Sequence, residues 1–306
     1  MDAVAKNTAL VPWFGSKRNL APTIAEELGP HSAYWEVFCG SMAVLLSKEP
    51  AAQEIVNDLH GDLINLARVI QDPEDGSYLY RKLRRVLACK QLMDEAAARF
   101  CDRGNVPAGD ALDIDRAFDY FVASWLGRNG VAGTSSYNQG FSRRFTKNGG
   151  DSGKRWCSAV DSIPAWRRRM RAVTILSEDA IGILERIEDA PGIAIYCDPP
   201  YLRETRSAGS GFGRGHGSSL YVHDFEDEDH ARLARALARF KLSRVVASYY
   251  DHPRLAELYP DWTQRKIEVS KAMASQGRRA ANDVRVTEVL LINGPSYAQP
   301  EGGRLF

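Results

Sequence analysis

The 306-residue chain carries 40 Lys and Arg against 39 Asp and Glu, and 44% of its residues are hydrophobic, which is typical of a globular enzyme. No apolar run reaches the roughly 18 residues of a membrane-spanning helix, and the N-terminus lacks the apolar core of a signal peptide, so we expect a cytoplasmic protein. Five scattered cysteines, none in a Cys-x-x-Cys spacing, argue against a disulfide framework and a zinc cluster.

Short apolar runs alternate with helical patterns along most of the chain. Helices are predicted at 20–28, 62–70 and 226–240. Because strands and helices alternate, we expect an α/β sheet that binds ligands at the carboxyl ends of its strands. The predicted strands are 32–41, 52–59, 171–179, 192–200 and 242–250, with a terminal antiparallel pair at 263–270 and 286–293.

The strand pattern lapses between residues 72 and 168. Helical patterns at 77–100 and 111–127 lead into a polar loop, 127–156, rich in Gly, Ser, Asn, Arg and aromatic residues. We interpret 72–168 as an inserted, mainly helical domain, which leaves 1–71 and 169–306 as the main domain. From residue 128 to residue 171, ten Lys and Arg stand against two Asp, a local net charge of +8. Such a field suits a phosphate-binding surface, although a charge run is more often a solvated face.

Two further charged segments have simple explanations. "HDFEDEDH" (223–230) has the composition of a metal cluster, but apolar residues follow it at helical spacing, so we expect an acidic first helical turn. "WRRRMR" (166–171) is either a phosphate-binding stripe or a solvated connector. His60 shows no ligand spacing to the other histidines and is interpreted as incidental.

Two strand ends suggest a nucleoside site. Gly40 follows the first strand, where a glycine permits the close backbone approach that a nucleotide needs. Asp58 ends the second strand near the roughly 20-residue spacing at which an acid meets a ribose hydroxyl. Alternatively, Gly40 is only a turn glycine and Asp58 only caps the helix that follows it. The chain has no G-x-G-x-x-G and no P-loop, so we expect a nucleoside without a pyrophosphate.

The fourth strand ends in "DPPY", residues 198–201. Two consecutive prolines have no backbone N–H to donate and fix an extended turn with exposed carbonyl groups. A carboxylate, a free carbonyl and an aromatic ring therefore come together at one sheet edge. A planar base with an amino group would find there two acceptors for the NH2 and a stacking surface for its ring.

With these motifs in this order, the sequence resembles the Dam-like N6-adenine DNA methyltransferases, which use S-adenosylmethionine. The resemblance covers nearly the whole chain and implies the class I methyltransferase fold, a Rossmann-like mixed sheet of about seven strands. It places 72–168 as the target-recognition domain and "LGRNGVAGTSSYN" (126–138) as a DNA-contacting loop. The motifs that match the family are "WFGSK" (13–17), "EVFCGS" (36–41), "NDLHGDLIN" (57–65), "LSEDA" (176–180) and "DPPY".

The resemblance also implies roles for individual residues. Met42 stands where the family has the last glycine of its cofactor loop, and Val37 stands where it commonly has proline. No metal is implied. The implied catalytic residues are Asp198, Pro199, Pro200 and Tyr201. The implied cofactor site contains Trp13, Phe14, Gly15, Lys17, Glu36, Phe38, Cys39, Gly40, Ser41, Asp58, Leu59, Asp179 and Asp198. The candidate contacts to double-stranded DNA are Arg128, Asn129, Thr134, Tyr137, Arg143 and Arg144.

The implied reaction is methyl transfer from S-adenosylmethionine to the N6 amino group of an adenine flipped out of duplex DNA. Asp198 and the Pro199 carbonyl would hold the amino group. Tyr201 would stack on the base or, alternatively, pack into the core behind the prolines. Two other functions remain open, an RNA adenine-N6 methyltransferase and a catalytically impaired DNA-binding module. The basic insert favours DNA, and the intact DPPY favours an active enzyme; a partner restriction endonuclease is not indicated either way.

Overall fold

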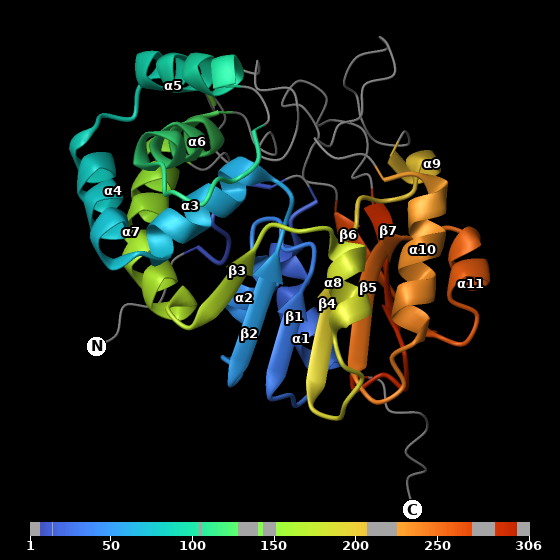
Figure 1. Ribbon diagram of the computed structural model, residues 1–306. Helices are drawn as coiled ribbons and strands as arrows, with labels where there is room; N and C mark the ends of the chain where they lie inside the picture. Colours follow the sequence, from blue (N-terminus) through green and yellow to red (C-terminus); the bar gives the residue numbers. More distant parts are fainter. Residues whose placement is uncertain are drawn as a thin grey trace, which may run out of the picture.

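The computed structural model describes residues 7–13, 15–103, 106–127, 140–142, 151–206, 225–270 and 285–298. Its centre is a seven-stranded sheet in the order β3-β2-β1-β4-β5-β7-β6 (Figure 1). The first five strands of this order are parallel, and β7 runs antiparallel between β5 and β6. The strands are β1 (Ala33–Glu36), β2 (Gln53–Asn57), β3 (Val173–Leu176), β4 (Ile193–Cys197), β5 (Arg244–Tyr250), β6 (Thr263–Ser270) and β7 (Arg285–Ile292). The predicted Rossmann-like mixed sheet and its terminal antiparallel pair are thus confirmed.

Both faces of the sheet are buried. In β4, Ala194 and Tyr196 contribute to one hydrophobic cluster, while Ile195 and Cys197 contribute to another. This alternation follows from the two-residue repeat of a strand, which sends successive side chains to opposite faces. Burial on both sides explains why these strands read as nearly continuous apolar runs in the sequence.

Helices cover each face of the sheet (Figure 1). Helices α1 (Ala21–Leu28) and α2 (Ala43–Ser47) contribute to the first cluster. The second cluster is covered by α8 (Ala180–Arg186), α10 (Asp227–Ala238) and α11 (Arg254–Leu258). Two short elements, the 3₁₀ helix η1 (Lys17–Asn19) and α9 (Arg203–Arg206), complete this part of the chain.

Helix α10 confirms the interpretation of the acidic segment before it. Glu226 and Asp229 form a capping box, and the helix begins with Asp227, Glu228 and Asp229 in its first turn. Negative charge there is stabilised by the unpaired N–H groups of the helix terminus. Within the described ranges, no group of three or more His, Cys, Asp or Glu could hold a metal ion.

Five helices gather beyond the β3 end of the sheet (Figure 1). They are α3 (Gly61–Gln71), α4 (Pro73–Arg85), α5 (Lys90–Arg103), α6 (Ile114–Leu126) and α7 (Ser152–Met170). The helical pattern predicted at 77–100 is confirmed as parts of two helices, because Val86 adopts an extended conformation that separates α4 from α5. The predicted polar loop also ends early, since Asp151 caps α7 by accepting a hydrogen bond from Gly153 N.

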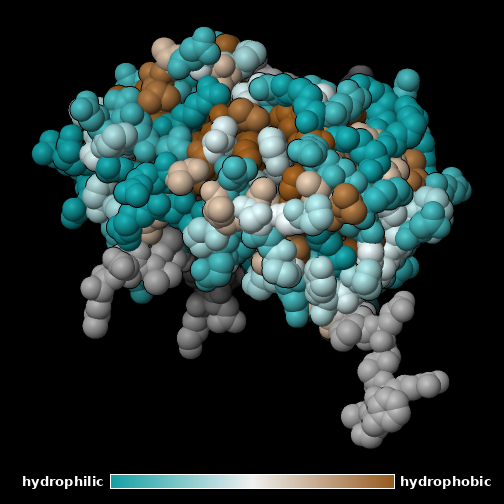
Figure 2. Space-filling view, turned by 60° about the horizontal axis from the view of Figure 1, so that its bottom comes forward, coloured by the Kyte–Doolittle hydropathy of each residue, from teal (hydrophilic) through white to brown (hydrophobic). Residues whose placement is uncertain are grey.

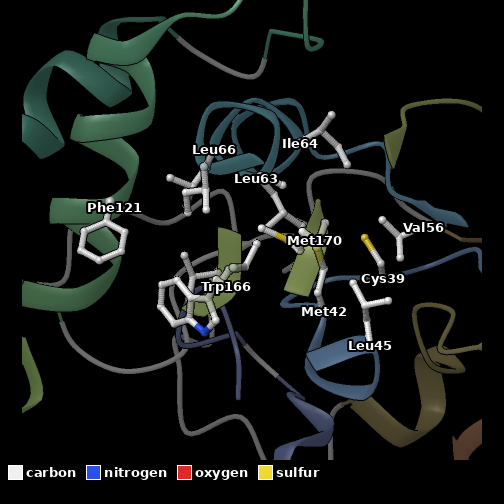
Figure 3. Close-up of a cluster of buried hydrophobic side chains, with 14 of the residues drawn as sticks. Cys39, Met42, Leu45, Val56, Leu63, Ile64, Leu66, Phe121, Trp166 and Met170 are labelled. Carbon is white, nitrogen blue, oxygen red and sulfur yellow. The ribbon is translucent and has the colours of Figure 1, made fainter. Parts of the chain in front are cut away.

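The helices of 72–168 share one hydrophobic cluster with the sheet. Figure 3 shows Phe121 and Trp166 from this segment together with Leu63, Leu66 and Met170. Two indoles also fix the N-terminal segment. Trp125 donates to the carbonyl of Leu10 at 2.9 Å, and Trp166 donates to that of Asn7 at 2.7 Å. The division of the chain into a catalytic part and a recognition part stays a prediction.

One arginine of the run at 166–171 forms an ion pair with a carboxylate of β2. Arg169 binds the carboxylate of Glu54, with Nη2 at 2.8 Å from Oε1, and Lys48 binds the same carboxylate at 2.7 Å. Arg167 donates to Ser77 Oγ at 2.9 Å. Arg169 therefore fixes the end of α7 to β2, which neither sequence interpretation of the run included.

The outer surface carries few large apolar side chains. Those exposed among the described residues are scattered: Leu59, Tyr78, Leu87, Val106, Leu242 and Tyr297. The face drawn in Figure 2 is mostly hydrophilic, with a limited group of hydrophobic residues near its middle. In the described part of the chain, no helix has the length and hydropathy required to cross a bilayer.

Candidate active site

A cavity of about 410 Å³ opens where the carboxyl ends of β1, β2, β3 and β4 meet. Its volume lies in the range of small-molecule sites, and its position is the one expected of a ligand site in a parallel sheet. Most of the residues predicted from the sequence border it. They are Trp13, Gly15, Lys17, Phe38, Gly40, Asp58, Leu59, Asp179, Asp198, Pro199, Pro200 and Tyr201.

The other predicted cofactor residues lie elsewhere. Glu36, Cys39 and Ser41 do not border the main cavity but line a space of about 10 Å³ beside it. Phe14 lies outside the described residues. The predicted DNA contacts Arg128, Asn129, Thr134, Tyr137, Arg143 and Arg144 also lie outside the described residues and stay predictions.

Asp58 joins the ends of β1 and β2. Its Oδ2 accepts a hydrogen bond from Gly40 N at 2.8 Å, and its Oδ1 accepts one from His60 N at 2.9 Å. Gly40 has φ +44°, and a Cβ there would come 3.1 Å from Trp13 Nε1. Glycine is therefore required at position 40 both by its backbone conformation and by the approach of the indole. Asp58 is not a helix cap, because His60 caps α3.

Several residues of the cavity were missed from the sequence. His60, interpreted as incidental, borders it, and its ring lies 5.5 Å from that of Trp13 at an interplanar angle of 76°. Its Nδ1 accepts a hydrogen bond from Leu63 N at 3.3 Å. The position two residues after Asp58 is a signal that could have found it. The other missed residues are Val37, Asn57, Ala180, Ile181, Phe225, Asp229 and Tyr250.

Asn57 fixes three strand ends to one another. Its Nδ2 donates to the carbonyl of Val37 at 3.1 Å and to that of Glu178 at 2.9 Å. Its Oδ1 accepts from Glu178 N at 2.8 Å. The side chain is almost fully buried, so these bonds replace hydrogen bonds that the backbone groups would otherwise make to water. These bonds therefore hold together the loops after β1, β2 and β3, which carry cavity residues.

Met42 adopts the left-handed conformation, with φ 57° and ψ 33°, which explains why glycine suits this position. Its amide donates to the carbonyl of Cys39 at 2.7 Å and closes the turn. The side chain is fully buried and belongs to the hydrophobic cluster of Figure 3, not to the lining of the cavity. Met42 thus leaves the cavity unobstructed, and its burial offsets an unfavourable backbone conformation.

Asp198 is held by two partners. Ser248 Oγ donates to its Oδ1 at 2.9 Å, and the Ser248 hydroxyl also lies 2.9 Å from the hydroxyl of Tyr196. The ammonium of Lys17 lies 3.0 Å from its Oδ2 and donates to the Gly15 carbonyl at 2.8 Å. Lys17 is only 4% exposed, so it is a buried cation paired with the carboxylate of the DPPY motif.

Tyr201 packs in the core and also borders the cavity, so the packing role considered from the sequence is observed and the stacking role stays a prediction. It is buried and belongs to the second hydrophobic cluster, and its ring lies 4.4 Å from that of Tyr250 at 67°. The Lys17 ammonium lies 4.9 Å from the ring centroid. The ring also borders the cavity. Burial raises the pKa of Tyr201, and the neighbouring Asp198 raises it further, so the phenol stays neutral.

Glu36 is a buried carboxyl at the end of β1. Its Oε2 accepts hydrogen bonds from the Tyr34 hydroxyl at 2.9 Å and from Leu45 N at 3.1 Å. Burial raises the pKa of Glu36 to about 8 despite these two bonds, which favour the ionised form. Glu36 thus supports the loop that carries Gly40.

The fold and the site are those of a Rossmann-like enzyme with a cavity at the carboxyl ends of its parallel strands and the DPPY motif on the border of that cavity. The chain belongs to the D12 class N6 adenine-specific DNA methyltransferase family, whose model matches residues 13–276. It is therefore an adenine-specific DNA methyltransferase. The resemblance stated from the sequence is confirmed, and the RNA alternative is not favoured.

Full-length relatives support this assignment. A DNA adenine methylase from Escherichia coli is 24% identical over 296 residues, covering 96% of this chain and 98% of its own. One from Serratia marcescens is 25% identical and covers 94% of this chain and 98% of its own. A retron DNA adenine methylase from Escherichia coli is 24% identical, and the match covers 94% of this chain and 92% of its own. Among solved structures, an rRNA methyltransferase from Streptomyces viridochromogenes shares 15% identity over 95% of this chain and 89% of its own, with a TM-score of 0.36, too low to indicate a shared activity.

Proposed function

We propose that the cavity binds S-adenosylmethionine and that the DPPY edge receives an adenine flipped out of duplex DNA. The observation that supports this is that the candidate cofactor site and the candidate base site line one cavity. Asp58 and Gly40 line the same cavity as Asp198 and Pro199. A cofactor bound by the first pair would therefore lie next to a base held by the second.

The residues of the cavity fit this cofactor. Asp58 and Asp179 supply carboxylates at the ends of β2 and β3, where a ribose and an adenine can donate hydrogen bonds. Trp13 and Phe38 supply aromatic surfaces for the ring. When bound, S-adenosylmethionine supplies an electrophilic methyl group. The pairing of Lys17 with Asp198 makes this lysine a support of the catalytic carboxylate in addition to its implied place in the cofactor site.

The chain's own part in the reaction is to hold the adenine amino group. The lone pair of this nitrogen is delocalised into the ring, which makes it a poor nucleophile. Hydrogen bonds accepted by Asp198 and the Pro199 carbonyl would localise it. Because Ser248 and Lys17 already fix Asp198, the acceptor needs no rearrangement when the base arrives. Holding two reactants in attack geometry contributes roughly 7 to 11 kcal/mol.

The segment 72–168 is proposed as the target-recognition part, with Arg143 and Arg144 among its phosphate contacts. Each phosphate contact contributes about −0.9 to the slope of log K against log salt. Replacing both arginines with glutamine should weaken DNA binding and flatten that slope by about two units. An unchanged slope would exclude them as phosphate contacts, and an altered site preference would make them base readers.

The experiment that tests the function is expression in a host that lacks adenine methylation. Direct sequencing of the host DNA should then reveal N6-methyladenine at one short sequence. Asp198→Ala should remove the modification, while Asp261→Ala, which changes an exposed carboxylate far along the chain, should leave it unchanged. Unmodified DNA from cells with folded parent protein would contradict the proposal.

A further inference from the structure

Glu288 is a second buried carboxyl beside the Lys17–Asp198 pair. It lies in the middle of β7, opposite Tyr250 of β5 and Ile267 of β6. Its side chain is 8% exposed, and its Oε2 lies 3.9 Å from the Lys17 ammonium. That distance joins opposite charges but is too long for a hydrogen bond.

Apart from the distant Lys17 ammonium, the described residues give Glu288 Oε2 no partner, and this oxygen accepts no hydrogen bond. Burying a carboxylate oxygen without a hydrogen bond costs folding free energy, and an apolar residue at this position of the strand would avoid that cost. In the mostly apolar sequence "VTEVLLI" the glutamate is the one charged residue. Such a group is more simply explained by the chemistry of the adjoining site than by stability.

Within the ranges that the structure describes, the titratable groups that face Glu288 are one cation, one carboxylate and three phenols. Burial raises the pKa of Glu288, Lys17 lowers it, and Asp198 raises it. The strand β6 brings the apolar Ile267 opposite it. The facing groups that carry or gain charge are Lys17, Asp198, Tyr196, Tyr201 and Tyr250. The phenols all have raised pKa values and stay neutral, so Lys17 and Asp198 decide the local charge.

The balance of charge then depends on Glu288. Lys17 and Asp198 cancel one another, so an ionised Glu288 leaves the cluster with one net negative charge. In methyl transfer the bond from sulfur to the methyl carbon breaks as the bond to N6 forms. The positive charge passes from sulfur to N6, which then loses one proton to water. A fixed negative charge near N6 stabilises the charge that develops there.

We propose that Glu288 is a positioning residue for this reaction. Its ionised carboxylate shares Lys17 with Asp198, so that Asp198 remains a strong acceptor for the adenine amino group. The inference rests on the proposed function and adds a pH dependence to it. Because only the ionised form acts, methyl transfer should slow as the pH falls through the raised pKa of Glu288.

The test is the single-turnover rate of methyl transfer from the ordinary glutamate pKa of 4.5 upward to roughly pH 9, with tritiated S-adenosylmethionine and a duplex that contains the mapped site. Glu288→Gln keeps the shape and removes the charge. It should be about tenfold slower than the parent at high pH and approach the parent at low pH. Glu288→Asp keeps the charge and should retain the rise of the rate with pH. Glu268→Gln, an exposed site on the neighbouring β6, should reproduce the parent profile.

Two further measurements separate this role from a structural one. Cofactor affinity of Glu288→Gln, measured by equilibrium dialysis, should stay within about threefold of the parent, and its melting temperature should be equal or higher, because a buried charge is removed. A variant with the parent rate at every pH overturns the inference alone. So does a rate loss that is equal at every pH and accompanied by a lower melting temperature. A folded parent without activity at any pH overturns the proposed function as well.

Discussion

The Lys17 ammonium lies 3.0 Å from Asp198 Oδ2, so the segment before α1 supports the residue that ends β4. Removing the cation leaves Asp198 and Glu288 as neighbouring carboxyls without compensation. Lys17→Met should therefore lower the free energy of unfolding by roughly 3 kcal/mol. Adding Asp198→Asn to the same chain should recover at least about 1 kcal/mol of this loss. Urea unfolding of the two single variants and the double variant measures the coupling, and additive effects would show that the two residues do not interact.

A substitution of Asp58 can distinguish an effect on protein stability from an effect on cofactor binding. Asp58→Ala leaves two backbone amides, those of Gly40 and His60, without their acceptor. We expect a loss of about 1 kcal/mol in stability and at least tenfold in cofactor affinity. Asp72→Ala is the matched control, because Asp72 also accepts from two backbone amides but caps α4 instead. It should cost similar stability and leave cofactor binding unchanged; equal binding losses in both variants would contradict a direct role of Asp58.

Substitutions of Met42 measure the free-energy cost of its left-handed backbone conformation. Met42→Ala and Met42→Gly both lose a buried side chain, at a cost of about 2 to 5 kcal/mol. The glycine variant should nevertheless be more stable than the alanine variant by about 1 kcal/mol, because only glycine adopts φ 57° without strain. Thermal and urea unfolding give the comparison. Cofactor affinity should change by less than about threefold in either variant, since the side chain lies in the core and not in the cavity.

Glu36 should make stability depend on pH. Its pKa is about 8 in the folded protein, raised by burial from the ordinary value of 4.5. Above pH 4.5 the unfolded chain gains a charge that the folded chain does not, so stability should fall as the pH rises from 4.5 to about 8 and then level off. The difference in unfolding free energy between the parent and Glu36→Gln should follow this course. A difference that stays constant over this pH range would mean that Glu36 is ionised in the folded state.

Tyr201 can be tested with two substitutions. Tyr201→Phe keeps the ring that contacts Tyr250 and should keep most of the activity. Tyr201→Ala opens a space in the core and should cost roughly 3 to 5 kcal/mol of stability in addition to about 1 to 3 kcal/mol of base stacking. Rates corrected for the folded fraction, together with the fluorescence of 2-aminopurine at the target base, separate the two losses. An activity loss that only tracks the unfolded fraction would leave Tyr201 a packing residue.

The sequence predicted the centre of the sheet well because β4 and β5 are buried on both faces and read as apolar runs bounded by turn residues. The residues at the edge of the site could be predicted equally well, since Asp58 and Asp198 directly follow their strands and Gly40 lies in the loop after the first strand. The break between α4 and α5 could not, because Val86 is neither glycine nor proline and its extended conformation is set by packing. Glu288 escaped for a related reason, because its neighbours Lys17 and Asp198 lie far away in the chain and no local pattern records them. His60 differs, since its position two residues after Asp58 is a local signal.

The two indole hydrogen bonds described above have a mechanical consequence. Trp125 and Trp166 come from the inserted helices, yet they bind the backbone of residues 7–10, which also pack under the loop after β1. Leu10 donates to the Ser41 carbonyl at 3.0 Å, so one short segment links the insert to the turn beside Gly40. The helices of 72–168 therefore share with the sheet both a hydrophobic core and a backbone link, so a substitution at either indole should also disturb the loop that carries Gly40.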